Sequence, residues 1–379
     1  MTSQIKVSRQ HKLSTTSCQR VVFEDLQPAK GTGTVIVQSD LSHPKLFPAV
    51  TGHVVNKRVL CPSTLYADMA MTVADYLYST LRPSAPPVGL NVCAMEVHKP
   101  LVAELPPSPD GQHIQLEAHA ELASGIMKLN IRSVTWDGQT LQDHGHGLVK
   151  YEDPATWTTE WQQINYLVRN QITLLETKLE NGSAHKILRG MAYKLFETLV
   201  TYSPKYQGME EVILDNTDTI ATAKIKFQVT PGADGDYFCS PFFVDNLCHL
   251  SGFIVNAADV ESAEPLVYIS HGWHSLKFLK PKEISPDREY RSFVRMMDQG
   301  KNVSAGDVYV FEGDDIVAVL YGLRFQGIPQ RLMDVLLPAI RNSGATFADG
   351  GLAAGKGKSE RKKVKEQKRK DSRGLGIAA

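Results

Sequence analysis

The sequence predicts an α+β protein in which two similar units follow one another, each with a long helix lying across an antiparallel sheet. Two apolar segments with the length of a helix recur, at 62–80 and 240–257. Each is preceded by a short β-like segment and followed by several more. Because segments of the same kind come in the same order at 30–153 and 185–328, we expect an internal duplication.

The first unit opens with a strand-like segment at 33–39 and continues into the first helix. Pro62 and Ser63 suit a helix start, and the helix is expected to run to about Thr80. Apolar residues recur every four positions on one of its faces: Leu65, Met69, Val73 and Leu77. The helix is therefore amphipathic and is expected to pack against other elements.

After this helix the first unit is rich in alternating and β-branched residues. Four strands are expected, at 90–101, 113–122, 127–136 and 140–152. An Asp-Gly dipeptide at 137–138 lies between the last two and is a typical hairpin signal. A helix that lies across a long antiparallel sheet follows from this order.

The second unit repeats the plan. A strand at 221–229 leads to the apolar helix at 240–257, and further strands are expected at 266–279, 288–298 and 305–328. The polar turn at 312–315 interrupts the last segment much as the turn at 136–139 does in the first unit. Two helix-on-sheet units joined in tandem are therefore the expected architecture.

The segments outside these units set the expected domain boundaries. Residues 154–203, notably 185–200, look helical and are expected to pack beside the second unit, with Pro204 ending the helix. Beyond Pro338 the chain becomes rich in Gly, Ala and Lys, so disorder is expected from about residue 345. Four parts result: an N-terminal linker at 1–25, a first unit at 26–160, a second unit with inserted helices at 161–340, and a disordered basic tail at 341–379.

Charge and composition exclude several function classes. The 379 residues include 41 Lys/Arg and 41 Asp/Glu, but residues 355–373 hold ten basic and three acidic ones, so a mildly acidic body carries a basic tail. This tail has no interleaved aromatics, so we interpret it as a solvated linker and expect no nucleic acid partner. The N-terminus lacks an apolar signal region, and nowhere do eighteen apolar residues run together, so we expect a cytoplasmic protein that does not enter a membrane. Five scattered cysteines without a CxxC spacing favour reduced thiols over a disulfide framework or a zinc cage.

Two residues could carry proton-transfer chemistry together. Asp245 falls inside the second apolar helix, where an ionised carboxylate is costly unless it has a partner. One possible partner is His249, four residues on and on the same helical face, which would form a purely structural pair. The other is His53 from the first unit, whose ring a carboxylate would hold in one tautomer and make more basic. His53 lies in a turn-like Thr-Gly-His sequence nine residues before Pro62, and this segment alone favours a surface or capping histidine.

Other polar and aromatic residues give weaker signals. The spacings His144-x-His146 and His271-x-x-His274 could serve a metal, but they lack a nearby carboxylate or cysteine set, so structural histidines are favoured. Three tyrosines could line a tunnel or pack in the core: Tyr66, Tyr202 and Tyr206. Neither GxSxG nor GxGxxG occurs, so acyl hydrolysis by a serine and reduction by a nicotinamide are disfavoured.

The spacing of His53 and Pro62, together with Asp245-x-x-x-His249, resembles the two active-site motifs of polyketide and fatty-acid dehydratases, which fold as double hot dogs. Those dehydratases usually have a glycine four residues after the histidine, where this chain has Lys57. Five blocks, in order, resemble the product template domains of fungal non-reducing polyketide synthases more closely: TTSCQRVV, GHVVNKRVLCPSTLYADMA, VTYSPKYQGMEEVIL, FFVDNLCHLSGFIVN and YISHGWHSLKF. This resemblance covers about residues 10–335.

The resemblance implies a double hot-dog enzyme that directs regioselective aldol cyclisation and aromatisation of a poly-β-ketone. It implies a substrate carried on the phosphopantetheine of an acyl carrier protein, with that carrier and the other domains of the same synthase as partners, a possible homodimer, and no cofactor or metal bound by the domain itself. His53 would be the catalytic base and Asp245 its partner. The other positions implied to contact substrate are Asn256, His249, Ser270, Pro62 and Tyr66. A dehydratase acting on a β-hydroxyacyl carrier protein and a non-catalytic acyl-chain-binding hot-dog module are the alternatives.

Overall fold

A continuous antiparallel sheet of thirteen strands organises the first of two units, Met1–Ala339 and Ile340–Ala379. The computed structural model describes residues 13–108, 110–230, 232–257, 266–337, 346–348 and 351–353. The strands of the first half of the sheet are β1 (Arg20–Gln27), β2 (Thr32–Asp40), β7 (His113–Glu121), β8 (Ile126–Val134), β9 (Thr140–Glu152) and β5 (Gly89–Val97), in spatial order. Those of the second half are β14 (Leu266–Phe278), β17 (Asp315–Pro329), β16 (Val303–Glu312), β15 (Tyr290–Asp298), β13 (Ile220–Ile225), β12 (Met209–Asp215) and β10 (His185–Leu188).

The strand order confirms the expected duplication. In each half, the strand that follows the long helix pairs with the last strand of that half: β5 with β9, and β14 with β17. Outward from β9 and β17 the strands also follow one order, β9-β8-β7-β2-β1 in one half and β17-β16-β15-β13-β12 in the other. The halves join edge to edge where β5 pairs antiparallel with β14. This is the expected double hot-dog architecture.

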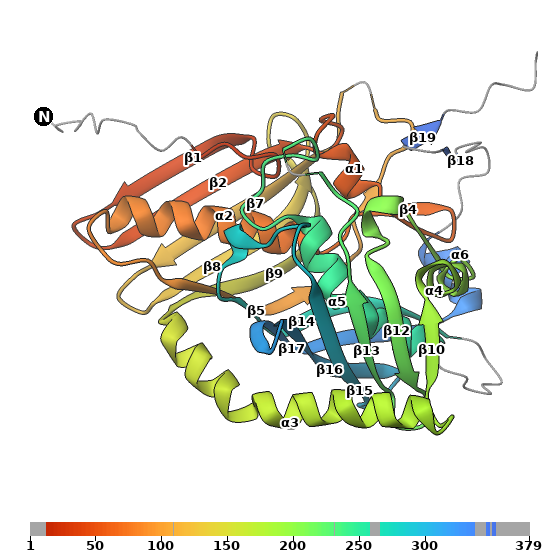
Figure 1. The fold of residues 1–379 in the computed structure, drawn as a ribbon. Helices are drawn as coiled ribbons and strands as arrows, with labels where there is room; N and C mark the ends of the chain where they lie inside the picture. Colours follow the sequence, from red (N-terminus) through yellow and green to blue (C-terminus); the bar gives the residue numbers. More distant parts are fainter. Residues whose placement is uncertain are drawn as a thin grey trace, which may run out of the picture. The chain divides into compact units, whose positions relative to one another are not determined.

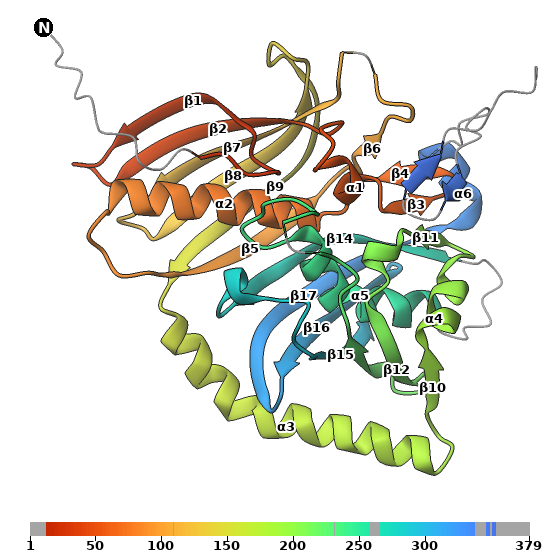
Figure 2. The same cartoon turned by 45° about the horizontal axis from the view of Figure 1, so that its top comes forward.

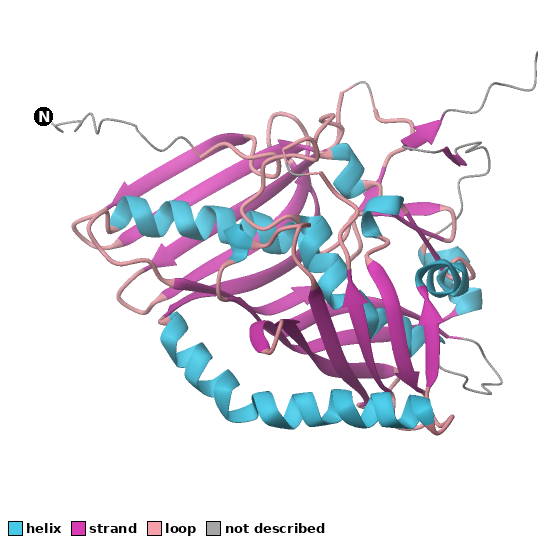
Figure 3. Ribbon diagram, in the orientation of Figure 1, coloured by secondary structure: helices cyan, strands magenta, loops and turns pink. Residues whose placement is uncertain are grey.

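Two helices cover one face of the sheet. Helix α2 (Thr64–Leu81) packs on the first half, and α5 (Pro241–Ala257) packs on the second half and also against α2 (Figures 1 and 3). Both were expected within two residues of these bounds. Because the two helices touch, side chains at the start of the second helix can meet side chains from the first half of the chain. None of the helices in the described ranges has the length and apolar character needed to cross a bilayer.

The long helix α3 (Pro154–Glu180) connects the halves and packs on the opposite face of the second half (Figure 2). Alternation along β12 shows the two faces: Val212 belongs to the core cluster that contains α5, whereas Ile213 belongs to the cluster with Trp161 of α3. Asp153 caps the helix by accepting a hydrogen bond from the backbone N–H of Ala155 at 2.9 Å. The segment therefore lies beside the second unit, as expected.

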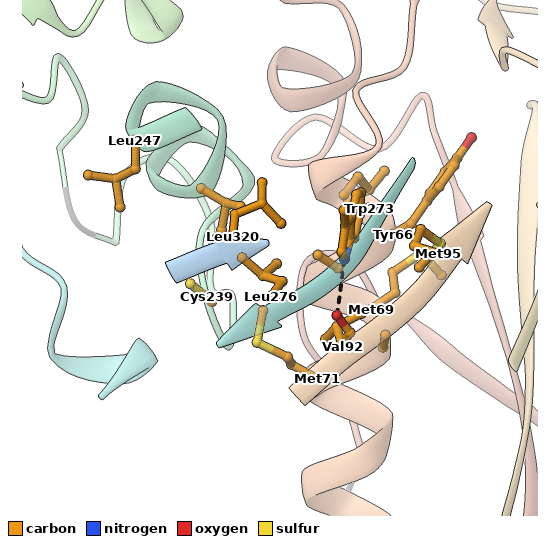
Figure 4. Close-up of a cluster of buried hydrophobic side chains, with 14 of the residues drawn as sticks. Tyr66, Met69, Met71, Val92, Met95, Cys239, Leu247, Trp273, Leu276 and Leu320 are labelled. Carbon is orange, nitrogen blue, oxygen red and sulfur yellow. Dashed lines mark hydrogen bonds between the residues drawn. The ribbon is translucent and has the colours of Figure 1, made fainter. Parts of the chain in front are cut away.

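The junction between the halves is apolar. Figure 4 shows Met69 and Tyr66 of α2, Met95 of β5 and Trp273 of β14 in one buried cluster. The Trp273 indole N–H donates to the Val92 carbonyl at 3.0 Å, which satisfies its polar group inside the core. Burial of these large side chains supports one core that spans both repeats.

The prediction of a helix over 185–200 is wrong in part. Residues His185–Leu188 form β10, which pairs with β12, and helix α4 covers only Arg189–Phe196. Val200 already belongs to the short strand β11 (Val200–Tyr202), and Pro204 starts a 3₁₀ turn, η1 (Pro204–Tyr206). Pairing with strands from distant parts of the chain outweighs the local helical pattern here.

Two expected boundaries also change. Residues 20–25, expected in the N-terminal linker, form most of β1, which pairs along its length with β2. The boundary expected between residues 160 and 161 falls inside α3. Of the tail expected to be disordered, the structure describes the paired strands β18 (Thr346–Ala348) and β19 (Gly351–Ala353), and the remainder lies outside the described residues.

Candidate active site

His53 lies at the start of a small hairpin. One turn of helix, α1 (Phe47–Val50), leads into β3 (His53–Val55), which pairs with β4 (Arg58–Leu60). The two residues between the strands, Asn56 and Lys57, have φ values of 47° and 59°, as a two-residue hairpin turn requires. Lys57 thus adopts the left-handed conformation that glycine favours. The hairpin therefore forms with lysine as it would with glycine, and the presence of Lys57 does not distinguish a dehydratase from another activity.

The inserted segment between the repeats reaches across to this hairpin. Strand β11 pairs antiparallel with β3, so that Tyr202 lies opposite His53. With β6 (Val102–Ala103), these strands form a separate four-stranded sheet in the order β11-β3-β4-β6. Backbone hydrogen bonds from the second half of the chain therefore fix the strand that carries the histidine.

The predicted pair meets in space. The Nε2 atom of His53 lies 3.3 Å from Oδ2 of Asp245, although the residues are 192 positions apart. The Nδ1 atom of His249 lies 3.0 Å from the same Oδ2 atom. Both partners considered for the aspartate are thus present at once. The side chains of His53 and Asp245 are 13% and 16% exposed, so they can be reached from the cavity described below.

The electrostatics of this trio favour an ionised carboxylate between two imidazoles. Burial opposes ionisation of Asp245, but His53 and His249 outweigh it and hold the pKa of the carboxyl well below its ordinary range. Burial lowers the pKa of His249, which is therefore neutral at pH 7. The tautomers that satisfy both contacts carry the proton on Nε2 of His53 and on Nδ1 of His249. Among the described residues, the other nitrogen of each ring has no hydrogen-bond partner.

Two tyrosine rings hold the imidazole of His53. The ring of Tyr202 meets it edge-on at a centroid distance of 4.8 Å, and the ring of Tyr206 does so at 4.4 Å. Tyr206 is fully buried, and its hydroxyl donates to the Ala49 carbonyl at 2.8 Å. A Cβ at Gly52 would collide with the Tyr206 ring, so glycine is required there for space. Tyr206 lies behind the histidine and outside the cavity lining, which makes it one of the packing aromatics considered above.

Asn246, which the sequence analysis missed, connects the loop that carries Tyr206 to α5. The fully buried Asn246 accepts from the Gly208 N–H at 2.6 Å and donates to the carbonyls of Lys205 and Phe242 at 2.9 and 2.8 Å. It therefore fixes the loop that carries Tyr206 next to the aspartate. The available signal was a polar residue next to Asp245 in a helix that is mostly apolar, since a polar side chain buried there needs hydrogen-bond partners.

The trio faces a mostly apolar cavity of about 170 Å³. This is smaller than the roughly 300–1,000 Å³ of typical ligand sites, so it has room for a small ligand or for one part of a larger one. Every position expected to contact substrate lines it: His53, Pro62, Tyr66, Asp245, His249, Asn256 and Ser270. Apolar lining residues from β14 and β17, such as Leu276 and Phe325, were missed, although alternation along those strands marks inward positions.

The lining residues differ in what their side chains are free to do. The amide of Asn256 donates to the carbonyls of Gly252 and Tyr268 at 2.9 and 3.2 Å and accepts from the Tyr268 N–H at 3.0 Å. Its visible role is to hold β14 against α5, and a direct substrate contact stays a prediction. Ser270 lies where the pairing of β14 with β17 shifts register, a bulge at the cavity wall. Burial raises the pKa of Tyr66 well above its ordinary value, so it presents a neutral phenol.

Two cysteines line the cavity, whereas the histidines of the His144-x-His146 spacing lie outside it. Cys61 and Cys248 line the cavity, but burial raises the pKa of both thiols, so neither is an activated nucleophile. His144 is buried with Nδ1 3.1 Å from the Lys99 carbonyl, as expected of a structural histidine. His146 is exposed and lies against a different histidine, His98.

Comparison with known proteins first defines the class. Residues 175–333 match the family model "Polyketide synthase dehydratase N-terminal domain". The dehydratase domain of RzxB from Pseudomonas fluorescens superposes with a TM-score of 0.60 at 16% identity, over 83% of this chain and 100% of that one. Two inactive mutants of the CurK dehydratase also superpose, each at 16% identity. The Asp-to-Asn mutant has a TM-score of 0.56 over 85% of this chain and 99% of its own. The His-to-Phe mutant has a TM-score of 0.57 over 81% of this chain and 96% of its own. The protein is a dehydratase-like double hot-dog domain.

The curated relatives narrow this class. The chain is 54% identical over 328 residues to non-reducing polyketide synthase Preu8 of Preussia isomera, which covers 86% of this chain. It is 48% identical over 332 residues, or 88% of the chain, to non-reducing polyketide synthase PKS1 of Zymoseptoria tritici. The matched segment spans about 15% of the length of each relative. The chain belongs with the dehydratase-like domains of fungal non-reducing polyketide synthases.

Proposed function

We propose that this domain is a product template: it directs aldol cyclisation and aromatisation of a poly-β-ketone, with His53 as base and Asp245 as its partner. The observation that carries the proposal is the His53–Asp245 contact at the wall of an apolar cavity. The substrate would be presented on the phosphopantetheine of an acyl carrier protein, and that carrier and the other domains of the synthase would be its partners. A cytoplasmic location and a homodimeric state stay predictions from the sequence.

The chemistry fits these residue types. A methylene between two carbonyls is acidic, so an imidazole can remove its proton, typically contributing about 10²–10⁴-fold. The enolate carbon then attacks a ketone carbon further along the chain, forming the C–C bond, and the alkoxide takes a proton back from the imidazolium. Loss of water and a further enolisation give the aromatic ring. No redox partner is required for this sequence of steps.

The aspartate stabilises the charge that forms in the first step. When His53 accepts the proton, an imidazolium lies 3.3 Å from an already ionised carboxylate. Because His249 stays neutral, the trio then carries no net charge inside a largely apolar wall. The remaining walls would select one folded conformer of the chain, which is how a cavity chooses the carbons that join.

The names of the relatives favour cyclisation over dehydration. A synthase described as non-reducing leaves its β-carbonyls as ketones, whereas a dehydratase needs a β-hydroxyacyl chain. An aldol reaction makes such a hydroxyl only as the ring closes. A dehydratase-like site can therefore serve the cyclase reaction, and two CurK dehydratase mutants described as inactive replace the same two residue types.

The test compares three proteins, each incubated with carrier protein loaded with a poly-β-ketone by the other synthase components, with products separated by mass spectrometry. The native domain should give one aromatic skeleton, whereas His53→Ala should give the pyrones of spontaneous closure. His185→Ala, at an exposed position on the edge strand β10, is the matched control and should behave as the native domain does.

Each alternative has its own outcome. If a folded His53→Ala domain gives the same products as the native domain, the catalytic proposal fails, and a non-catalytic acyl-chain-binding module is the alternative that fits. Water loss from a β-hydroxyacyl carrier protein, without any effect on ring closure, would make the domain a dehydratase. Circular dichroism of both variants checks that a lost activity is not a lost fold.

A further inference from the structure

Three exposed side chains gather on the surface where β5 ends beside β9. Glu96 lies directly opposite His146 in the β5–β9 ladder, and His98 follows two positions after Glu96. The backbone N–H of His98 donates to the His144 carbonyl at 2.8 Å, so the chain stays alongside β9 beyond the end of the strand. Residues two apart on an extended chain, and their cross-strand neighbours, share a face of the sheet. The three side chains are thus brought together by the backbone.

The atoms are spaced as ligands of one ion. Nε2 of His98 lies 2.9 Å from Nδ1 of His146, the His146 nitrogen that would share the ion with it, and a Glu96 carboxylate oxygen lies 4.0 Å from the opposite nitrogen of the His146 ring, Nε2. One ligand atom from each of the three residues lies within 4.8 Å of the others. Within the described part of the chain, these side chains form hydrogen bonds and ion pairs only with one another.

We propose that Glu96, His98 and His146 form a binding site for a divalent transition-metal ion, with Zn²⁺ as the reference. Two imidazoles and one carboxylate are a donor set that zinc accepts, with water completing the coordination. Zinc–nitrogen bonds of about 2.0–2.1 Å in a tetrahedron place two nitrogens about 3.3 Å apart, so the rings need to separate by only about 0.4 Å. Exposed side chains can do this by small torsional changes. Imidazole ligands also disfavour Mg²⁺ and Ca²⁺, which prefer oxygen.

The site shares its backbone with the catalytic cavity. Val97 and Pro100, on either side of His98, both line that cavity, while Glu96 and His98 face the surface. A bound ion would tie the end of β5 to β9 and so brace one wall of the cavity from outside. The site itself rests on the surface geometry and is independent of the reaction that the domain catalyses.

Isothermal titration of the full chain with ZnCl₂, after treatment with a chelator, tests the proposal. One equivalent should bind to the native protein. His146→Ala and His98→Ala should each weaken binding by at least about tenfold, and Glu96→Gln, which keeps the size of the side chain, should weaken it about three- to tenfold. His185→Ala removes an exposed histidine elsewhere and should bind as the native chain does. The melting temperature of the native chain should also rise with zinc concentration, and that of His146→Ala should not.

The proposal is overturned if the native chain takes up no zinc, or if His98→Ala and His146→Ala bind as tightly as His185→Ala. Calcium serves as the ion control, and equal binding of Ca²⁺ would also contradict the donor set. All variants replace exposed side chains, so their fold should persist, and unchanged circular dichroism without metal verifies this.

Discussion

Replacing Gly52 with alanine tests how His53, the proposed base, is held. The added Cβ would lie far inside the 3.4–4 Å of ordinary van der Waals contact with two carbons of the Tyr206 ring. That ring cannot swing away freely, because it is fully buried and its hydroxyl donates to Ala49. The ring also lies 4.4 Å from the ring of His53, centroid to centroid. Displacement of the tyrosine ring would therefore also displace the His53 ring.

The expected cost follows from these contacts. Overpacking at a site that cannot relax costs about 1–3 kcal/mol, and loss of the buried Tyr206–Ala49 hydrogen bond adds about 1 kcal/mol. Gly52→Ala should thus lower the free energy of unfolding by about 2–4 kcal/mol. A shift of the imidazole by about 1 Å would also reduce ring closure roughly 10²-fold in the molecules that remain folded.

Urea denaturation and the carrier-protein product assay measure the two effects separately. Gly190→Ala is the matched control, because a Cβ at that position in α4 meets no atom within 4 Å. In a helix this substitution should raise stability by about 0.5–1 kcal/mol, the opposite sign. If Gly52→Ala unfolds at the native urea concentration and gives the native product ratio, the packing argument for His53 fails.

Two further predictions concern the carboxylates of Asp245 and Asp68. Asp245→Asn should leave the fold intact and reduce turnover about 10²–10⁴-fold. The reason is that a charge pair at 3.3 Å is worth about 5 kcal/mol at an effective dielectric constant of 20, before the desolvation cost is deducted. Turnover within threefold of the native rate would contradict this prediction. Asp68 of α2 is fully buried, and burial raises its pKa to about 7 although Ser17 and the Cys239 N–H bond to it. Its folded pKa lies above the unfolded value, so its contribution to stability is complete below about pH 4 and falls by up to about 4 kcal/mol as the pH rises to 7. Asp68→Asn should remove this dependence of the free energy of unfolding on pH. In urea unfolding, the stability of the variant relative to the native protein should therefore be higher at pH 8 than at pH 5. The same pH dependence in both proteins would refute the raised pKa of Asp68.

The fold could be predicted where the sequence carries a period. The long helices α2 and α5 and the strands after them have apolar repeats of nearly four or of two, because each buries one face. Strand β1 lacks that signal: it lies at the sheet edge and most of its side chains are exposed. Residues 185–188 were missed for a similar reason, because four residues at the opposite edge are too short to show a period. An edge strand is defined by the neighbouring strand with which it pairs, and the sequence of the edge segment itself does not reveal that neighbour.

The site could be predicted in its residues but not in its support. A carboxylate inside an apolar helix demands a partner, and the duplication explains how His53 can reach Asp245. Nothing in the sequence indicated that the three-residue strand β11 would pair with β3 and set Tyr202 opposite the histidine. The sequence argument also treated His53 and His249 as alternatives. The structure contains both contacts, on the same oxygen of Asp245.

That shared oxygen gives His249 a distinct role beside the proposed catalytic pair, His53 and Asp245. Its ring is more deeply buried than that of His53, and burial lowers its pKa, so a second imidazolium does not form there at neutral pH. A neutral His249 still donates one hydrogen bond, which fixes the direction of the carboxylate without competing for its charge. The full negative charge of Asp245 therefore remains available to the imidazolium of His53. A lysine or arginine in place of His249 would orient the same carboxylate but neutralise its charge permanently, and His53, the proposed base, would lose the negative charge that stabilises its imidazolium.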